Sequence, residues 1–154
     1  MQVIRWFSMG ALTMLALSAS LVRAEVVDIG NDELKALLDK GVPVVDLRTA
    51  GEWRQTGVVR GSQLITLFDE QGRADPADWQ RKLDKVAPAD KPVILICRTG
   101  NRTGKAAQYL DKAGRKGTVY NVRTGITGWA KEGRATVSLD ENIRSAGISC
   151  SPSC

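Results

Sequence analysis

Short apolar runs alternate with stretches of helical periodicity along this 154-residue chain, and this alternation restricts the fold more than any other feature. The clearest runs are residues 43–47 and 92–96, and four of the five residues in the second are branched aliphatics. Runs of this kind are typical of strands buried on both faces, and helices between such strands indicate a parallel sheet. The sequence therefore predicts an α/β domain with helices on both faces of the sheet.

The remaining elements follow the same alternation. Further strands are predicted at 26–29, 63–65 and 118–122. Helices are predicted from Asn31 or Asp32 to Gly41, over 52–55, 76–86, 104–113 and 125–132, with Asp75 as an N-cap before a proline. The stretch from residue 136 on is polar and shows no clear pattern. We therefore expect one domain over 25–135 and a polar tail over 136–154.

The first 24 residues resemble a secretory signal peptide. One positive charge at Arg5 precedes a mostly apolar stretch, and Val22 and Ala24 occupy the small-residue positions of a cleavage site. The 17 residues between Arg5 and Arg23 are too short and too often polar for a spanning helix, which argues against an uncleaved anchor. We expect cleavage after Ala24, a periplasmic or secreted protein, and no stable membrane insertion.

Charge and residue types exclude several functions. The chain has 22 Lys and Arg against 17 Asp and Glu, and the basic residues are scattered rather than clustered. A nucleic-acid partner is therefore not expected, although a mild attraction for small anions is. The chain has no histidine, which excludes histidine-ligated metals and catalytic pairs of histidine with serine or cysteine. We expect no metal and no cofactor.

Cys97 stands where a site is expected in such a fold. It follows the run at 92–96, and ligands of α/β folds bind beyond the carboxyl ends of the strands. A loop that curls around the sulfur would point its N–H groups inward, where a helix dipole and arginines also favour negative charge. The six residues after Cys97 form this predicted loop, and they are Arg98, Thr99, Gly100, Asn101, Arg102 and Thr103.

The composition of the loop supports an anion cradle. Gly100 permits the positive φ that the curl needs, and Asn101 tolerates it better than most residues. Cationic groups and helix N-termini convert cysteines into reactive thiolates, so the loop could activate Cys97 without a histidine. The alternative is that Cys97 is a buried, inert residue at the end of a strand.

Three stretches resemble the signature regions of the single-domain rhodaneses, a family of sulfurtransferases. They are 44–65 (VVDLRTAGEWRQTGVVRGSQLI), 93–110 (VILICRTGNRTGKAAQYL) and 119–133 (VYNVRTGITGWAKEG). The resemblance extends over about residues 26–133 and implies a five-stranded parallel sheet with helices on both faces. It identifies Cys97 as the catalytic cysteine that carries a persulfide, and residues 98–103 as the loop that binds the substrate anion.

The resemblance also assigns supporting residues. Asp46, Arg48 and Glu52 match the D-x-R-x-x-x-E segment of the family, and we interpret them as structural, with Asp46 capping near the loop and Arg48 pairing with Glu52 to brace it. Val58 stands where the family often has a histidine, which removes a polar contact. Trp129 follows the closing glycine motif and is expected in the core.

The length of the loop favours sulfur over phosphorus. Phosphatases of the dual-specificity type share this fold and carry the longer motif C-x5-R, whereas here Thr103 is the seventh residue and Arg102 comes one position early. We expect sulfane sulfur to pass from a small anionic, thiosulfate-like donor to cyanide or a thiol, with a thiol protein as a further partner. The alternatives are a non-catalytic carrier that delivers sulfur to a protein and, against the loop count, a phosphatase or arsenate reductase.

The tail contains the other two cysteines, Cys150 and Cys154, in the sequence CSPSC. A local disulfide between them would suit an oxidising compartment and would leave Cys97 as a free thiol. A relay in which a tail thiol attacks a persulfide on Cys97 is an alternative. A soft-metal site is a weaker one, because two thiolates leave the coordination short.

Overall fold

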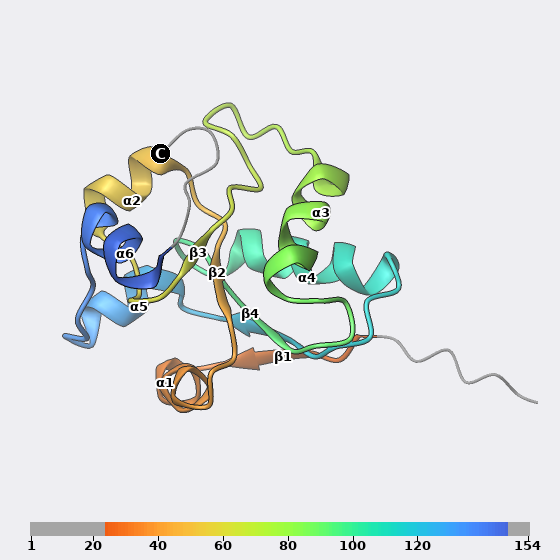
Figure 1. The fold of residues 1–154 in the computed structure, drawn as a ribbon, viewed down its shortest axis with the longest axis horizontal. Coiled ribbons are helices and arrows are strands. Elements are labelled where there is room, and N and C mark those ends of the chain that lie inside the picture. Colours follow the sequence, from red (N-terminus) through yellow and green to blue (C-terminus); the bar gives the residue numbers. More distant parts are fainter. Residues whose placement is uncertain (1–23, 148–154) are drawn as a thin grey trace, which may run out of the picture.

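The computed structural model describes residues 24–147, so the predicted signal peptide except Ala24, and both tail cysteines, lie outside the described residues (Figure 1). The described part contains five strands and six helices. The strands are Val26–Ile29 (β1), Val44–Asp46 (β2), Gln63–Leu64 (β3), Val93–Ile96 (β4) and Val119–Val122 (β5). The helices are Asn31–Asp39 (α1), Ala50–Thr56 (α2), Pro76–Val86 (α3), Asn101–Lys112 (α4), Gly125–Lys131 (α5) and Leu139–Ala146 (α6). Between residues 24 and 147, none of the helices has the length and apolar character that crossing a bilayer requires.

The five strands form one parallel sheet in the order β1-β5-β4-β2-β3. This arrangement confirms the predicted sheet. Strand β4 lies in the middle, and all four of its residues are buried, as its unbroken apolar sequence requires. All carboxyl ends lie at one edge, so the segments that follow β2, β4 and β5 meet there.

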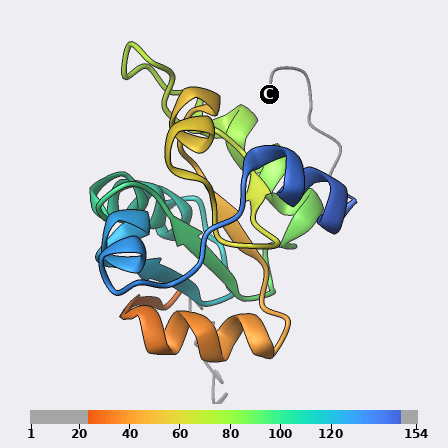
Figure 2. The same cartoon turned by 90° about the vertical axis from the view of Figure 1, so that its left-hand side faces the viewer.

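Helices cover both faces of the sheet, as the alternation predicts. Figure 1 shows α1 below the sheet and α3 and α4 above it, and Figure 2 shows the same separation from the side. On one face, Trp79 and Leu83 of α3 and Leu110 of α4 pack against the sheet, while Leu34 of α1 and Trp129 of α5 pack on the other. The expectation that Trp129 belongs to the core is confirmed.

Helix α4 starts three residues earlier than the predicted range of 104–113. Gly100 adopts a left-handed conformation with φ of +86° and stands at the N-cap, so Asn101 is already helical. Residues 101–103 are therefore the first turn of a helix rather than the end of a loop. The helix therefore begins directly after Gly100, whose N–H donates to the sulfur of Cys97.

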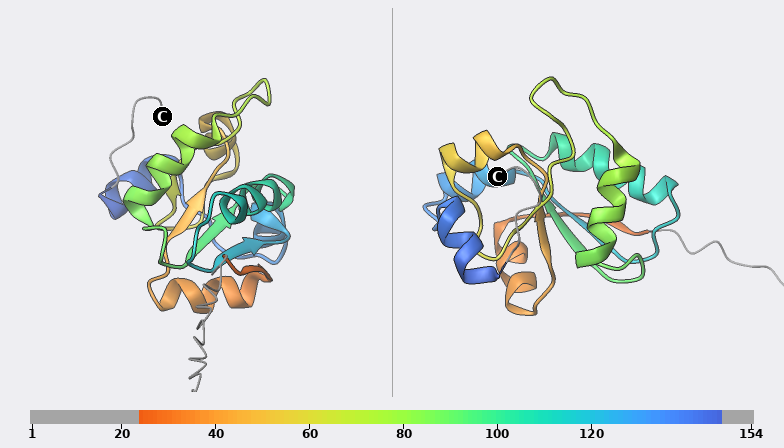
Figure 3. Two further views of the ribbon diagram at one scale, coloured as in Figure 1. Left: turned by 90° about the vertical axis from the view of Figure 1, so that its right-hand side faces the viewer. Right: turned by 45° about the horizontal axis from the view of Figure 1, so that its top comes forward.

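The stretch after residue 136 was expected to be a polar tail, and its first part is instead packed on the domain. Val58 and Val137 form an antiparallel bridge with two N–H to O bonds of 2.9 Å. Val137 and Leu139 join Trp53 of α2 in a third apolar cluster, and α6 lies beside α2 (Figure 3). Val58 is fully buried there and makes an apolar contact with this C-terminal segment.

Candidate active site

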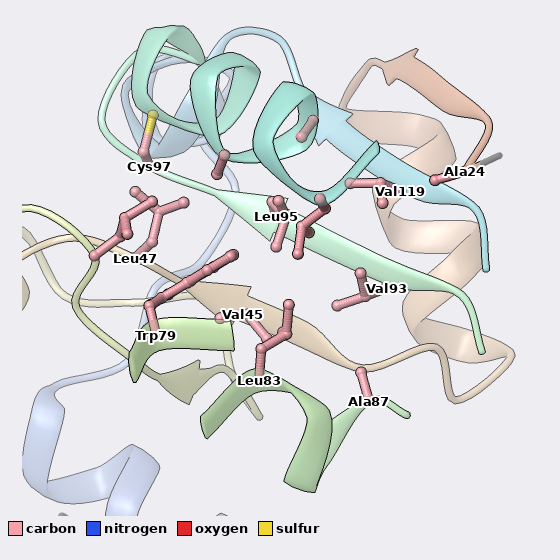
Figure 4. Close-up of a cluster of buried hydrophobic side chains, with 14 residues drawn as sticks. Ala24, Val45, Leu47, Trp79, Leu83, Ala87, Val93, Leu95, Cys97 and Val119 are labelled. Carbon is pink, nitrogen blue, oxygen red and sulfur yellow. The ribbon is translucent and has the colours of Figure 1, made fainter. Parts of the chain in front are cut away.

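Cys97 lies at the carboxyl end of β4, at the edge of the apolar cluster that also contains Leu47 and Trp79 (Figure 4). Its residue surface is 1% exposed. The N–H group of Gly100 donates a hydrogen bond to Sγ at 3.2 Å. The hydroxyl of Thr103 lies 3.6 Å from Sγ and donates to the carbonyl of Gly100 at 2.7 Å. The loop therefore curls over the sulfur as predicted.

The curl depends on the positive φ of Gly100. A Cβ on this residue would clash with the backbone carbonyl of Arg123, which follows β5. Glycine is thus required both by the backbone conformation and by the close approach of a second segment. Arg98 and Thr99 are exposed at the outer side of the loop.

Arg102 does not point freely into solvent. Its two terminal nitrogens donate to the two carboxylate oxygens of Glu52 at 2.7 and 2.5 Å. These hydrogen bonds lower the pKa of Glu52 from 4.5 to about 2, and the same pair raises the pKa of Arg102. The predicted contribution of Arg102 to anion binding is therefore largely offset by a neighbouring carboxylate.

Glu52 is itself fixed by the start of α2. Its carboxylate accepts a hydrogen bond from the N–H of Thr49 at 3.1 Å, and the Thr49 hydroxyl accepts from the N–H of Glu52 at 3.4 Å. This is a capping box, which satisfies N–H groups that the helix start leaves unpaired. The first turn of α2 and the first turn of α4 are thus joined beside Cys97.

The predicted pairing of Arg48 with Glu52 is wrong. Arg48 pairs with Asp46, with its Nε and Nη2 atoms 2.7 to 3.0 Å from the carboxylate, and both side chains are buried. Arg48 also donates to Thr56 and to the carbonyl of Gly57, which ties the end of β2 to the end of α2. Arg48 precedes the N-cap Thr49, so it is not on a helix with Glu52 and the spacing of four residues carries no pairing.

An open cleft of about 380 Å³ lies beside the loop. It is lined by Thr49, Glu52, Asp69, Glu70, Arg98 and Arg102. Asp69 accepts hydrogen bonds from the side chain and the N–H of Arg73 at 2.7 and 2.8 Å, which fixes the turn at 69–73 as one wall. Within residues 24–147, Arg98 makes no ion pair or side-chain hydrogen bond, so it is the unpaired guanidinium of the cleft.

Sequence reasoning missed two parts of this site. Asp69 and Glu70 lie in a segment without a helix or strand pattern, and nothing in the sequence places it over the loop. The N–H groups of Ile126 and Thr127 in α5 donate to the carbonyls of Cys97 and Arg98 at 2.8 and 3.1 Å. The glycines of the segment 123–128 were the available signal for this backbone contact, since glycine often marks a close approach of two chains.

The fold and the site define a class of α/β proteins in which a cysteine at the carboxyl edge of a parallel sheet accepts a backbone N–H from the loop that curls over its sulfur. The model of the rhodanese-like domain matches residues 30–132 of this chain. The chain therefore belongs to the rhodanese-like domain family. Its relatives include thiosulfate sulfurtransferase 18 of Arabidopsis thaliana, 28% identical over 118 residues, which are 74% of this chain and 85% of the relative.

Solved structures agree with this assignment. The rhodanese-like domain protein from Staphylococcus aureus superposes with a TM-score of 0.53 and 26% identity, over 73% of this chain and 99% of that one. The thiosulfate sulfurtransferase from Pseudomonas aeruginosa gives a TM-score of 0.60 and 23% identity, over 73% of this chain and 20% of that one. The second likeness concerns the fold alone.

Proposed function

We propose that this chain is a sulfurtransferase that takes sulfane sulfur from a small anionic donor such as thiosulfate and carries it as a persulfide on Cys97. The observation that carries the proposal is the hydrogen bond from the Gly100 N–H to Sγ of Cys97 at 3.2 Å, at the start of a helix. Negative charge on this sulfur is stabilised by the N–H of Gly100, the helix dipole and the charge of Arg102.

The reaction has two displacement steps. The Cys97 thiolate attacks the outer sulfur of thiosulfate, the sulfur–sulfur bond of the donor breaks, and sulfite leaves with the bonding electrons. An acceptor, cyanide or a thiolate, then attacks the outer sulfur of the persulfide, and the Cys97 thiolate leaves. This is covalent catalysis with ping-pong kinetics, and no histidine is needed because the departing groups are stable anions.

The geometry also supports sulfur transfer over phosphoryl transfer. A transferred phosphoryl group needs cationic groups on its equatorial oxygens. Here the seventh residue of the motif is the fully buried Thr103, whose hydroxyl binds within the loop, and Arg102 is held by Glu52. A single sulfur atom needs less room and less charge.

The charges of the cleft favour binding of the donor anion to the guanidinium group of Arg98. Of the two arginines, Arg102 is paired, while Asp69 and Glu70 add carboxylates to the lining of the cleft. Like charges near the mouth repel a dianion, so we expect the Michaelis constant for thiosulfate to depend strongly on Arg98.

Intact mass spectrometry tests the proposal. Thiosulfate should add one sulfur atom to the protein, cyanide should remove it with formation of thiocyanate, and Cys97→Ser should abolish both. The double variant Cys150→Ser, Cys154→Ser is the matched control and should still gain the sulfur. Thiocyanate formation by Cys97→Ser would refute the proposal, and sulfur loading without steady-state turnover would indicate a carrier instead.

We also propose that the chain is exported and that residues 25–154 form the working protein, on the pattern of the first 24 residues. N-terminal sequencing of protein recovered from the exported fraction tests this. A sequence starting at Glu25 is expected, and protein retained in the cytoplasm with an intact N-terminus would contradict it.

A further inference from the structure

The loop that follows Cys97 rests on the first turn of α5. The N–H of Ile126 donates to the carbonyl of Cys97 at 2.8 Å, and the N–H of Thr127 donates to the carbonyl of Arg98 at 3.1 Å. The first N–H groups of a helix have no partner within it, and the first intrahelical bond of α5 starts at the N–H of Gly128. The carbonyls of the loop therefore supply the acceptors that the start of α5 lacks.

These two hydrogen bonds also fix the direction of the N–H groups in the loop. The N–H and C=O groups of a trans peptide point in opposite directions, and the described residues contain no cis peptide bond. Because the carbonyls of Cys97 and Arg98 face α5, the N–H groups of Arg98 and Thr99 face away from it. Neither of these N–H groups has an acceptor within residues 24–147, so both are available to an anion.

Two glycines allow the contact, one from each side. A Cβ on Gly125, which has φ of +57°, would clash with the carbonyl groups of Cys97 and Arg98. A Cβ on Gly100 would clash with the carbonyl of Arg123. Backbone packs on backbone here, so a change of side-chain rotamer cannot accommodate an added methyl group. Either the loop or the start of α5 would have to move.

We propose that the first turn of α5, with Gly125 at its start, is a positioning element for Cys97. It holds the N–H groups of Arg98 and Thr99 in the orientation that stabilises negative charge at the sulfur and at a transferred sulfur atom. Donors fixed before the reaction stabilise developing charge without reorganisation. This inference rests on the proposed function only in naming sulfur as the transferred atom. The N–H groups would stabilise negative charge at Cys97 whatever group it transfers.

A pair of glycine variants tests this role, in a background with Cys150→Ser and Cys154→Ser so that Cys97 alone is labelled. Gly133 at the other end of α5 is the matched control, because it has φ of +71° with nothing within 4 Å of an added Cβ. Both Gly125→Ala and Gly133→Ala carry the penalty of an L-residue at positive φ. Only Gly125→Ala places a methyl group against the loop.

Three measurements are made below the unfolding transitions of both variants. Gly125→Ala should slow alkylation of Cys97 by iodoacetamide at neutral pH by about tenfold, and should move the midpoint of the pH profile of alkylation upward. It should lower kcat for thiosulfate by about 10- to 100-fold, with a smaller change in KM. Gly133→Ala should stay close to the parent protein in all three.

Equal alkylation profiles and equal kcat in the two variants would overturn the proposal. If Gly125→Ala gives no folded protein, Thr127→Pro takes its place, because it removes the N–H donated to Arg98 and no intrahelical bond. The same slower alkylation is then expected, and an unchanged profile overturns the proposal. If the parent protein transfers no sulfur, but the alkylation profiles still differ, the proposed function fails and the role of α5 stands.

Discussion

At the scale of residues, the two arginines of the loop after Cys97 differ in the partners that their guanidinium groups have within the described part of the chain. Arg98 lines the cleft and makes no ion pair with any residue between 24 and 147, whereas Arg102 is held by Glu52 through two hydrogen bonds. The two arginines of the loop, which look equivalent in the sequence, therefore have different roles. Arg102 joins the loop to α2, while Arg98 is the arginine that we propose binds the substrate anion.

Replacement of Arg98 by alanine should weaken donor binding. We expect KM for thiosulfate to rise about tenfold, the effect of losing one charged hydrogen bond of about 1.4 kcal/mol, with kcat changed much less. Steady-state kinetics over a range of thiosulfate concentrations measures both constants. Arg54→Ala, which removes an exposed arginine of α2, is the control and should leave KM unchanged. An unchanged KM in Arg98→Ala would contradict the role of this residue.

Replacement of Glu52 by glutamine should alter how stability depends on pH. The folded-state pKa of Glu52 is lowered from 4.5 to about 2 by the hydrogen bonds from Arg102. A lowered folded-state pKa contributes stability that is present above pH 4.5 and is lost as the pH falls towards 2. The parent protein should therefore lose more unfolding free energy than Glu52→Gln between pH 5 and pH 2. At pH 7 the variant should be less stable by about 1 kcal/mol, since the pair is partly exposed.

Urea unfolding at several pH values measures this difference. Glu33→Gln is a matched control, because Glu33 has the same position in α1, where its carboxylate accepts the N–H of Gly30 at 2.9 Å and pairs with no arginine within residues 24–147. Parallel stability curves for the parent protein and Glu52→Gln would show that the ion pair does not carry the pH dependence.

At the scale of elements, apolar runs predicted the strands well, because a strand that is buried on both faces needs apolar side chains at consecutive positions. The start of α4 was predicted three residues late. Its N-cap is a left-handed glycine, which has no side chain to cap the helix and so does not mark the helix start in the sequence. Helix α6 was missed because only Leu139 and Ile143 mark its apolar side. The available signal was the capping pattern from Ser138, whose hydroxyl accepts the N–H of Glu141 at 3.2 Å.

The site was predictable only where it depends on local sequence. The cysteine at the end of β4 and the positive φ of Gly100 follow from neighbours along the chain. The pair of Arg102 with Glu52 joins residues 50 positions apart, and it depends on strand order, which no pattern within either segment specifies. The incorrect pairing of Arg48 with Glu52 has the same origin, because the buried contact of Arg48 with Asp46 and the contact of Glu52 with Arg102 both depend on how the segments meet.

Helix α6 should contribute measurably to stability through Asn142. This side chain is fully buried, donates to the carbonyl of Ser62 at 2.9 Å and accepts the N–H of Gly61 at 2.8 Å. Asn142→Ala would leave both backbone groups without partners and should reduce the free energy of unfolding by about 2 kcal/mol. Urea unfolding tests this, with the exposed Arg144→Ala of the same helix as control. Equal stability of the two variants would show that α6 is not docked in solution.

At the scale of the whole molecule, the order of the strands brings the functional segments together. Strand β4 is the centre of the sheet, with β2 on one side and β5 on the other. The segments after these three strands supply the capping box with Glu52, the loop with Cys97, and the start of α5. The N–H of Gly100 donates to the sulfur of Cys97, and the start of α5 binds the carbonyls of Cys97 and Arg98, so backbone groups from two segments fix the cysteine in a chain that has no histidine.

The three cysteines of the chain are divided between the site, which contains Cys97, and the C-terminal sequence, which contains Cys150 and Cys154. Cys97 is 1% exposed, while closing a ring between Cys150 and Cys154 costs far less chain entropy than closing one to Cys97. In protein purified under oxidising conditions, we expect the tail cysteines to pair and Cys97 to remain a free thiol. The intact mass should be two hydrogens below that of the reduced chain, and Cys97→Ser should show the same loss. Cys150→Ser should abolish the loss, because the two cysteines that remain are far apart in the sequence and Cys97 is buried. If Cys150→Ser retains the loss and Cys97→Ser does not, the disulfide joins Cys97 to the tail, and a relay from the persulfide to Cys154 becomes the better account of the C-terminal sequence.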